Sequence, residues 1–133
     1  MNISSDLSPA AGLRTGSSVA DIKQSFLDNL FCGLGRAPLA ASLHDAYLAL
    51  ALTVRDRVLH QGVQTLENYA HKDVRAVAYL SAEFLPGPHL ANNLLNLGIT
   101  KQTRQAMTEL GLNLDDLIEL EEEPGLGNGG LGR

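Results

Sequence analysis

One short apolar run decides what this chain can form by itself. Ala76-Val77-Ala78-Tyr79-Leu80 is continuous and apolar, and it follows the polar residues His71-Lys72-Asp73. Such a run is typical of a strand buried on both faces of a parallel sheet, so the sequence predicts one buried strand over about residues 76–82. Because one strand cannot make a sheet, it needs partners from further sequence or from another subunit. We therefore expect an incomplete fold.

Helical periodicity occupies most of the remaining chain. Ser18 with Asp21, and Ser42 with Asp45, have the spacing of capping boxes and precede apolar residues at helical intervals. The second of these helices is expected to break at Gly62 and to continue to about residue 69. The predicted fold class is mainly α, with three shorter helices after the strand, over residues 90–97, 100–110 and 113–120.

Charge and composition exclude several classes of function. Fifteen Asp and Glu against ten Lys and Arg give a net charge of −5, so no basic surface is available for nucleic acid. The single cysteine, Cys32, excludes an internal disulfide, and the four histidines are too scattered to predict a metal site. No apolar run is long enough to span a bilayer, and residues 1–18 lack the pattern of a secretory signal. We expect a cytoplasmic protein that binds no membrane.

Glycine is concentrated near the C-terminal end, where five of the 13 glycines fall within the last nine residues. Gly125-Leu126-Gly127-Asn128-Gly129-Gly130 has the G-x-G-x-x-G spacing of a dinucleotide-binding loop. The preceding residues, Glu119 to Pro124, are polar rather than the apolar strand that such a loop requires, which disfavours a dinucleotide site. Adjacent glycines can still bring backbone N–H groups close to phosphate or another anion. The alternative interpretation is a flexible tail.

Polar side chains near the predicted strand are candidates for ligand contact. Glu83 follows the strand, where open α/β sheets place ligand-binding groups, although an exposed carboxylate is the commoner role of Glu. Asn92, Asn93 and Asn96 can hydrogen-bond a sugar, or they can cap and cross-link helices. The residues by themselves predict an anion-binding loop attached to an incomplete fold, without a recognisable nucleophile and base.

Three stretches together carry a family resemblance: YLSAEFL at 79–85, NNLLNLG at 92–98 and EEEPGLGNGGLGR at 121–133. In order and spacing they resemble the α-glucan phosphorylases, which act on glycogen, starch or maltodextrin. Residues 21–26 and 48–56 extend the similarity, so that it covers nearly everything from about Ser18 onward and corresponds to the N-terminal portion of the family.

The resemblance implies a two-lobed α/β fold of the glycosyltransferase-B type, a homodimer, and pyridoxal 5'-phosphate on a lysine that lies outside this chain. It implies release of α-D-glucose 1-phosphate from an α-1,4-glucan by inorganic phosphate. In such enzymes the loop that corresponds to Asn128, Gly129, Gly130 and Leu131 lies on the substrate and phosphate side, and Glu83 would lie near the bound glucose. No catalytic residue is assigned within the chain.

Departures from the family pattern bear on the cofactor and on regulation. Leu85 stands where the family commonly has an aromatic residue, and Pro86-Gly87-Pro88 stands where it has Met-Gly-Arg, which weakens the expected cofactor-side contacts. Ala70 stands where AMP-regulated animal members have a stacking tyrosine, and the first residues hold no Arg and Lys cluster around a serine. We expect an enzyme that resembles the unregulated bacterial members.

The sequence thus predicts a mobile leader at residues 1–17 and an incomplete N-terminal lobe of a phosphorylase at residues 18–133, inactive alone. A small non-enzymatic module that binds an anion or a partner is the alternative hypothesis. A stable, cooperative fold in isolation would favour the module.

Overall fold

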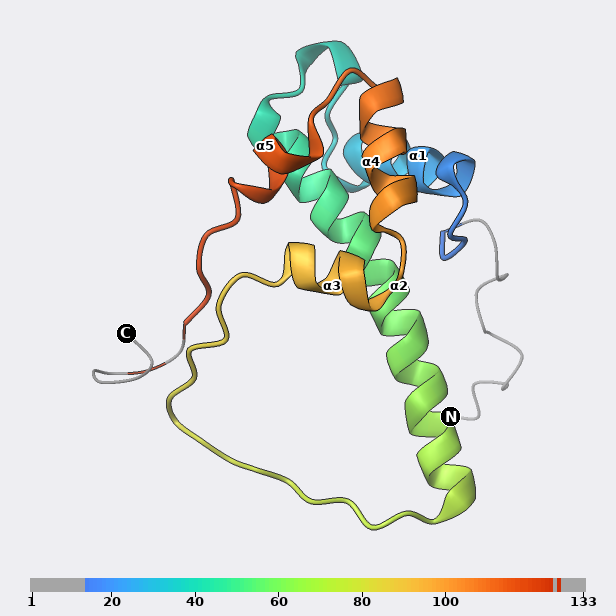
Figure 1. The fold of residues 1–133 in the computed structure, drawn as a ribbon, viewed down its shortest axis with the longest axis vertical. Coiled ribbons are helices and arrows are strands. Elements are labelled where there is room, and N and C mark those ends of the chain that lie inside the picture. The colour runs from blue at the N-terminus through green and yellow to red at the C-terminus, as the bar shows by residue number, and fades with distance from the viewer. Residues whose placement is uncertain (1–13, 126, 128–133) are drawn as a thin grey trace.

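The helices of this protein gather around the first half of one long helix (Figure 1). The computed structural model describes residues 14–125 and residue 127. The mainly helical class predicted from the sequence is confirmed. In chain order the elements are α1 (Val19–Asp28), the π-helical turn η1 (Asn29–Gly33), the 3-10 turn η2 (Pro38–Ala40), α2 (Leu43–Lys72), α3 (Leu90–Asn96), α4 (Thr100–Glu109) and α5 (Leu114–Ile118).

The core lies where α1, α3 and α5 meet the N-terminal half of α2 and where α4 packs against α1, α3 and α5. Removing these side chains from water is the main source of stability of the bundle. Every buried residue of α2 lies between Ala46 and Arg57, so the helix beyond residue 57 projects away from the bundle (Figure 1). The buried apolar side chains are those of Ile22, Phe26, Leu30, Ala46, Ala49, Leu50, Val54, Leu90, Leu94, Ile99, Ala106, Met107, Leu114 and Leu117.

Both predicted capping boxes are confirmed. The Oγ of Ser18 accepts a hydrogen bond from the Asp21 N–H at 3.1 Å, and the Asp21 carboxylate accepts one from the Ser18 N–H at 3.2 Å. The corresponding distances between Ser42 and Asp45 are 3.1 and 2.9 Å. These reciprocal bonds satisfy backbone N–H groups that have no partner within the first turn, and they set where α1 and α2 begin.

The predicted break of the second helix at Gly62 is wrong, because α2 is continuous from Leu43 to Lys72. One glycine costs a helix about 1 kcal/mol relative to alanine, which a helix of 30 residues tolerates. The helix ends instead at Asp73, whose φ of 48° is left-handed. No helix in residues 14–125 is both long and apolar enough to cross a membrane.

The predicted strand over residues 76–82 is also wrong for this structure. Residues 74–81 have no regular secondary structure, and the described part of the chain holds no strand, only a single bridge residue at Phe84. Val77 is 96% exposed and Leu80 is 91% exposed, so the run predicted to be buried on both faces lies in solvent. The physical reason is that strand hydrogen bonds need a neighbouring strand, which the described residues do not supply.

Two arginines attach the segment before α1 to α2. Arg57 is only 4% exposed, and its guanidinium donates to the Gly16 carbonyl oxygen at 3.0 Å from Nε and 2.6 Å from Nη2. Arg14 lies in the segment before α1 and donates to the Asp56 carboxylate of α2 at 2.9 Å and to the Asn29 side chain. Residues 1–13 lie outside the described residues, and the division into a leader, residues 1–17, and a lobe, residues 18–133, stays a prediction.

Candidate substrate-side site

The predicted site residues fall on two stretches of chain. Glu83 belongs to the segment that joins α2 to α3, and its side chain is half-buried. The other predicted residues follow α5. Asn128, Gly129, Gly130 and Leu131 lie outside the described residues.

A small turn holds the backbone of Glu83. The Oγ of Ser81 accepts a hydrogen bond from the Glu83 N–H at 3.1 Å and donates one to the Glu83 carbonyl oxygen at 2.8 Å. This local pairing engages the backbone of Glu83 and leaves its carboxylate without a hydrogen bond to any described residue. The Glu83 carboxylate can therefore accept hydrogen bonds from a ligand or from another part of the protein.

The three asparagines of α3 separate into two environments. Asn92 and Asn96 are exposed on the helix surface, whereas Asn93 is half-buried and lines a depression between α2 and α3. Sequence analysis left open whether these amides bind a ligand or cross-link helices. Of the three, Asn93 lines the depression described here.

The carboxylate of Glu121 joins the two stretches of the candidate site. Its Oε1 accepts a hydrogen bond from the His89 N–H, and its Oε2 accepts one from the Leu90 N–H, each at 2.8 Å. The sequence marks Glu119 to Pro124 only as polar residues before the glycine loop and does not predict this contact. One local signal existed, because Pro86-Gly87-Pro88-His89 offers α3 none of the Ser, Thr, Asp or Asn side chains that usually cap a helix.

The depression beside Glu121 has a volume of about 190 Å³ and is formed by α2, His89, α3 and Glu121. Tyr47 of α2 lies in its wall. Burial, and then the negative charges of Glu121 and Glu122, raise the pKa of the Tyr47 phenol above its usual value. Tyr47 is therefore a neutral hydrogen-bonding group at neutral pH.

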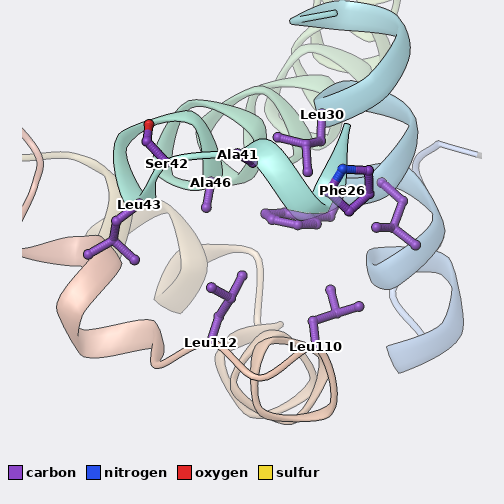
Figure 2. A pocket seen from close by; sticks show the side chains of 10 residues that line it. Phe26, Leu30, Ala41, Ser42, Leu43, Ala46, Leu110 and Leu112 are labelled. Atoms are coloured by element: carbon purple, nitrogen blue, oxygen red, sulfur yellow. The ribbon is translucent and has the colours of Figure 1, made fainter. Parts of the chain in front are cut away.

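A second pocket, of about 240 Å³, has the wrong chemistry for a sugar or phosphate (Figure 2). It lies between α1, η2, the start of α2 and the turn after α4, and nine of its ten lining side chains are apolar. The exception, Ser42, uses its hydroxyl in the capping box. Figure 2 shows Phe26, Leu30, Ala46, Leu110 and Leu112 around this space, which makes it a gap in the apolar packing.

The described residues form neither a metal site nor an attachment site for pyridoxal phosphate. Within residues 14–125 and 127, no three His, Cys, Asp or Glu side chains gather as metal ligands would. A lysine that forms an imine with pyridoxal phosphate needs an enclosed setting that suppresses its charge. Lys23 forms an ion pair with Glu109 at 2.8 Å, and Lys72 and Lys101 are exposed, so none of the three lysines fits that role.

Comparison with known proteins identifies relatives along nearly the whole chain. A glycogen phosphorylase of Synechocystis is 55% identical over 120 residues, which is 90% of this chain and 14% of that protein. A glycogen phosphorylase of Chlamydia trachomatis is 42% identical over 120 residues, covering 90% of this chain and 15% of that protein. The liver form of human glycogen phosphorylase is 42% identical over 116 residues, which is 87% of this chain and 14% of that protein. No protein-family profile matches the chain.

This level of identity places the chain in the class of phosphorylases, because it extends over about nine tenths of the residues rather than over one motif. The chain belongs to the glycogen phosphorylase family and corresponds to one part of such an enzyme. It spans about one seventh of the length of the curated relatives that it matches. The family resemblance expected from the three sequence stretches is thereby confirmed.

Proposed function

We propose that the full-length protein containing this chain is an α-1,4-glucan phosphorylase. It transfers the terminal glucose of the glucan to inorganic phosphate and releases α-D-glucose 1-phosphate. The observation that carries this proposal is the 55% identity to a glycogen phosphorylase over 120 of the 133 residues. The helical structure and the half-buried Glu83 are compatible with a segment that borders a substrate cleft.

Within this proposal, the glycine loop acts through its backbone. Asn128, Gly129, Gly130 and Leu131 bind on the substrate and phosphate side, where successive N–H groups without large side chains can approach phosphate oxygens closely. Such N–H groups stabilise negative charge that develops during the transfer, without having to reorganise. Glu83 is the weaker member of the site and is proposed to lie near the bound glucose, where its carboxylate, which accepts no hydrogen bond from a described residue, accepts hydrogen bonds from sugar hydroxyls.

The cofactor of this proposal, pyridoxal 5'-phosphate, is bound elsewhere in the full-length protein. None of Lys23, Lys72 and Lys101 has the setting that the attachment lysine needs. We therefore derive no catalytic step through the cofactor from this chain. Because the attachment lysine is absent, the 133-residue chain is proposed to be inactive alone.

The remaining parts of the proposal concern the whole protein. It has two α/β lobes of the glycosyltransferase-B type, acts as a homodimer and works in the cytoplasm. The exposed apolar run around Val77 and Leu80 supports a larger fold, because a surface of this kind is normally covered. Its substrates are an α-1,4-glucan and inorganic phosphate.

A pair of matched glycine substitutions tests the role of the loop. In the full-length protein, we expect Gly130→Ala to lower kcat/KM for phosphate by about tenfold or more, because a methyl group separates the backbone from the anion. Gly62→Ala adds the same methyl group where nothing lies within 4 Å, so its activity should equal that of the unchanged protein. Equal activity of all three proteins would contradict the proposed loop function.

A further inference from the structure

Among the described residues, Glu121 accepts the only side-chain hydrogen bonds between the start of α3 and the segment after α5. Both of its carboxylate oxygens are used, one by each of two successive backbone N–H groups, His89 and Leu90, at 2.8 Å. The contact spans 31 and 32 residues of sequence. It is therefore a tertiary connection as well as a helix cap.

The two segments that Glu121 connects are the ones that carry the proposed site. His89 follows Glu83 by six residues, across the Pro86-Gly87-Pro88 turn. Glu121 precedes Asn128 by seven residues, with Pro124 and Gly125 between them. Both stretches leave the helical core beside this carboxylate. The carboxylate thus fixes the relative positions from which they start.

The two hydrogen bonds of Glu121 are of a kind that fixes the relative positions of the segments they join. Bonds from N–H groups to a carboxylate are charge-assisted and stronger than bonds between neutral groups. Two acceptors in one rigid plane also restrict the orientation of the partners, because both bonds must be satisfied together. Glu121 is half-buried beside Tyr47, and Leu90 is 4% exposed, which limits competition from water at one of the two bonds.

We propose that Glu121 is a positioning residue for phosphorolysis: its carboxylate holds the start of α3 against the end of α5 and so fixes the Glu83 segment relative to the chain that follows α5. This role rests on the proposed function. Glu121 itself touches neither substrate nor phosphate in this account. A misplacement of reacting groups by about 1 Å can cost as much as a hundredfold in rate, so a distant support of this kind can control activity.

The test compares three variants of the full-length protein: Glu121→Ala, Glu121→Gln and Glu122→Ala. Glu122→Ala is the matched control, because it removes the same charge from the next residue, which is exposed and accepts no hydrogen bond from a described residue. Hydrogen exchange of the peptide that contains His89 and Leu90 reports whether the cap is lost. Steady-state kinetics with maltodextrin and phosphate report positioning.

We expect Glu121→Ala to exchange faster at His89 and Leu90 and to lose about tenfold or more in kcat, with the KM for glucan within about twofold of the unchanged protein. Glu121→Gln keeps one acceptor oxygen, so its exchange rate and its kcat should lie between those of Glu121→Ala and those of the unchanged protein. Glu122→Ala should match the unchanged protein in both measurements. If Glu121→Ala does not fold, exchange at His89 and Leu90 and kcat are compared between Glu121→Gln and Glu122→Ala. Faster exchange with a lower kcat in Glu121→Gln alone supports the role of Glu121.

Two results would overturn the role of Glu121. One is faster exchange at His89 and Leu90 with unchanged kcat, which would make Glu121 a helix cap without influence on the reaction. The other is unchanged exchange at His89 and Leu90 in Glu121→Ala, which would show that Glu121 does not hold these two N–H groups. An unchanged full-length protein that shows no phosphorolysis would instead refute the proposed function, and this role with it.

Discussion

At the scale of single residues, Arg57 is the one charged side chain that is buried in the helical core among the described residues. It is 4% exposed and donates to the Thr53 and Gly16 carbonyl oxygens and to the Ser25 hydroxyl. Burial lowers the pKa of its guanidinium, and the nearby charges of Asp21 and Asp56 oppose that shift. Arg57 thereby ties α1, α2 and the segment before α1 together.

Replacing Arg57 should therefore open α1 locally. We expect Arg57→Met to lower the free energy of opening of α1 by about 2 to 3 kcal/mol, because buried acceptors lose charged donors. Arg55→Met is the control: its side chain is 57% exposed, and its bond to Asp56 should contribute no more than about 1 kcal/mol. Native-state hydrogen exchange in the full-length protein measures both. Equal effects of the two variants would contradict this role of Arg57.

The capping carboxylates make a prediction about pH. The N–H of Ser42, followed by its hydroxyl, lowers the pKa of Asp45 below its ordinary value. A depressed folded-state pKa means that this carboxylate stabilises the fold above its unfolded pKa, of about 3.9, and that the contribution is lost as pH falls through the folded pKa. We expect a carboxyl NMR titration to give Asp45 a low pKa that Ser42→Ala raises. An unchanged pKa in Ser42→Ala would contradict the assignment.

At the scale of elements, local sequence signals predict where helices begin better than where long helices break. Ser18 and Ser42 cap the helices that their spacing predicts, and Asn113 caps α5, because a cap is decided by residues within one turn. Gly62 misleads because a single helical glycine is only mildly unfavourable, and the packing and hydrogen bonds of the rest of α2 outweigh it.

Two glycines of opposite conformation test this explanation. Gly62→Ala should stabilise α2 by about 0.5 to 1 kcal/mol, since the position is helical and its surroundings are open. Gly98→Ala has equal space but a φ of +69°, and it should destabilise the turn after α3 by about 1 kcal/mol or more. Local exchange rates in the full-length protein distinguish the two. A stabilising Gly98→Ala would be inconsistent with the left-handed turn.

The candidate site was less predictable than the helices. The apolar pattern of residues 76–80 predicts burial, but whether a strand forms depends on a partner that a local pattern does not report. The contact of Glu121 with His89 and Leu90 joins residues 31 and 32 positions apart, so neither residue carries a local signal for the other. Local patterns made Glu83 and the glycine loop candidates, and the family resemblance added the ligands that they are expected to face.

At the scale of the whole molecule, the isolated chain combines a packed core with uncovered apolar surface. Besides Val77 and Leu80, the projecting half of α2 exposes Leu59, Val63 and Leu66. We expect the 133-residue chain to show a helical circular dichroism spectrum but to self-associate, because such surfaces drive aggregation. A monomeric chain with a sharp cooperative melt would contradict this expectation and favour the binding-module hypothesis.

Substitution of the apolar run provides the control for that measurement. Val77→Ser with Leu80→Ser removes two side chains that are 96% and 91% exposed, and it should shift sedimentation towards monomer. Leu39→Ser changes one fully exposed leucine in η2, away from this run, and should shift the sedimentation towards monomer by less. An equal shift in both variants would show that the run has no special part in association.

Regulation is a second property of the whole protein. Ala70 lacks the ring that an adenine could stack on, so we expect AMP to leave the activity of the full-length protein nearly unchanged. An AMP titration of initial rates at fixed phosphate measures this. Strong activation by AMP would overturn the expectation of an unregulated enzyme.

The most direct test of the proposed function is product formation by the full-length protein. Purified protein reconstituted with pyridoxal phosphate is incubated with maltodextrin and inorganic phosphate, and the product is followed by phosphorus and proton NMR. We expect glucose 1-phosphate in the α configuration from the full-length protein and none from the 133-residue chain. Absence of glucose 1-phosphate from the full-length protein, or its formation by the isolated chain, would contradict the proposed function.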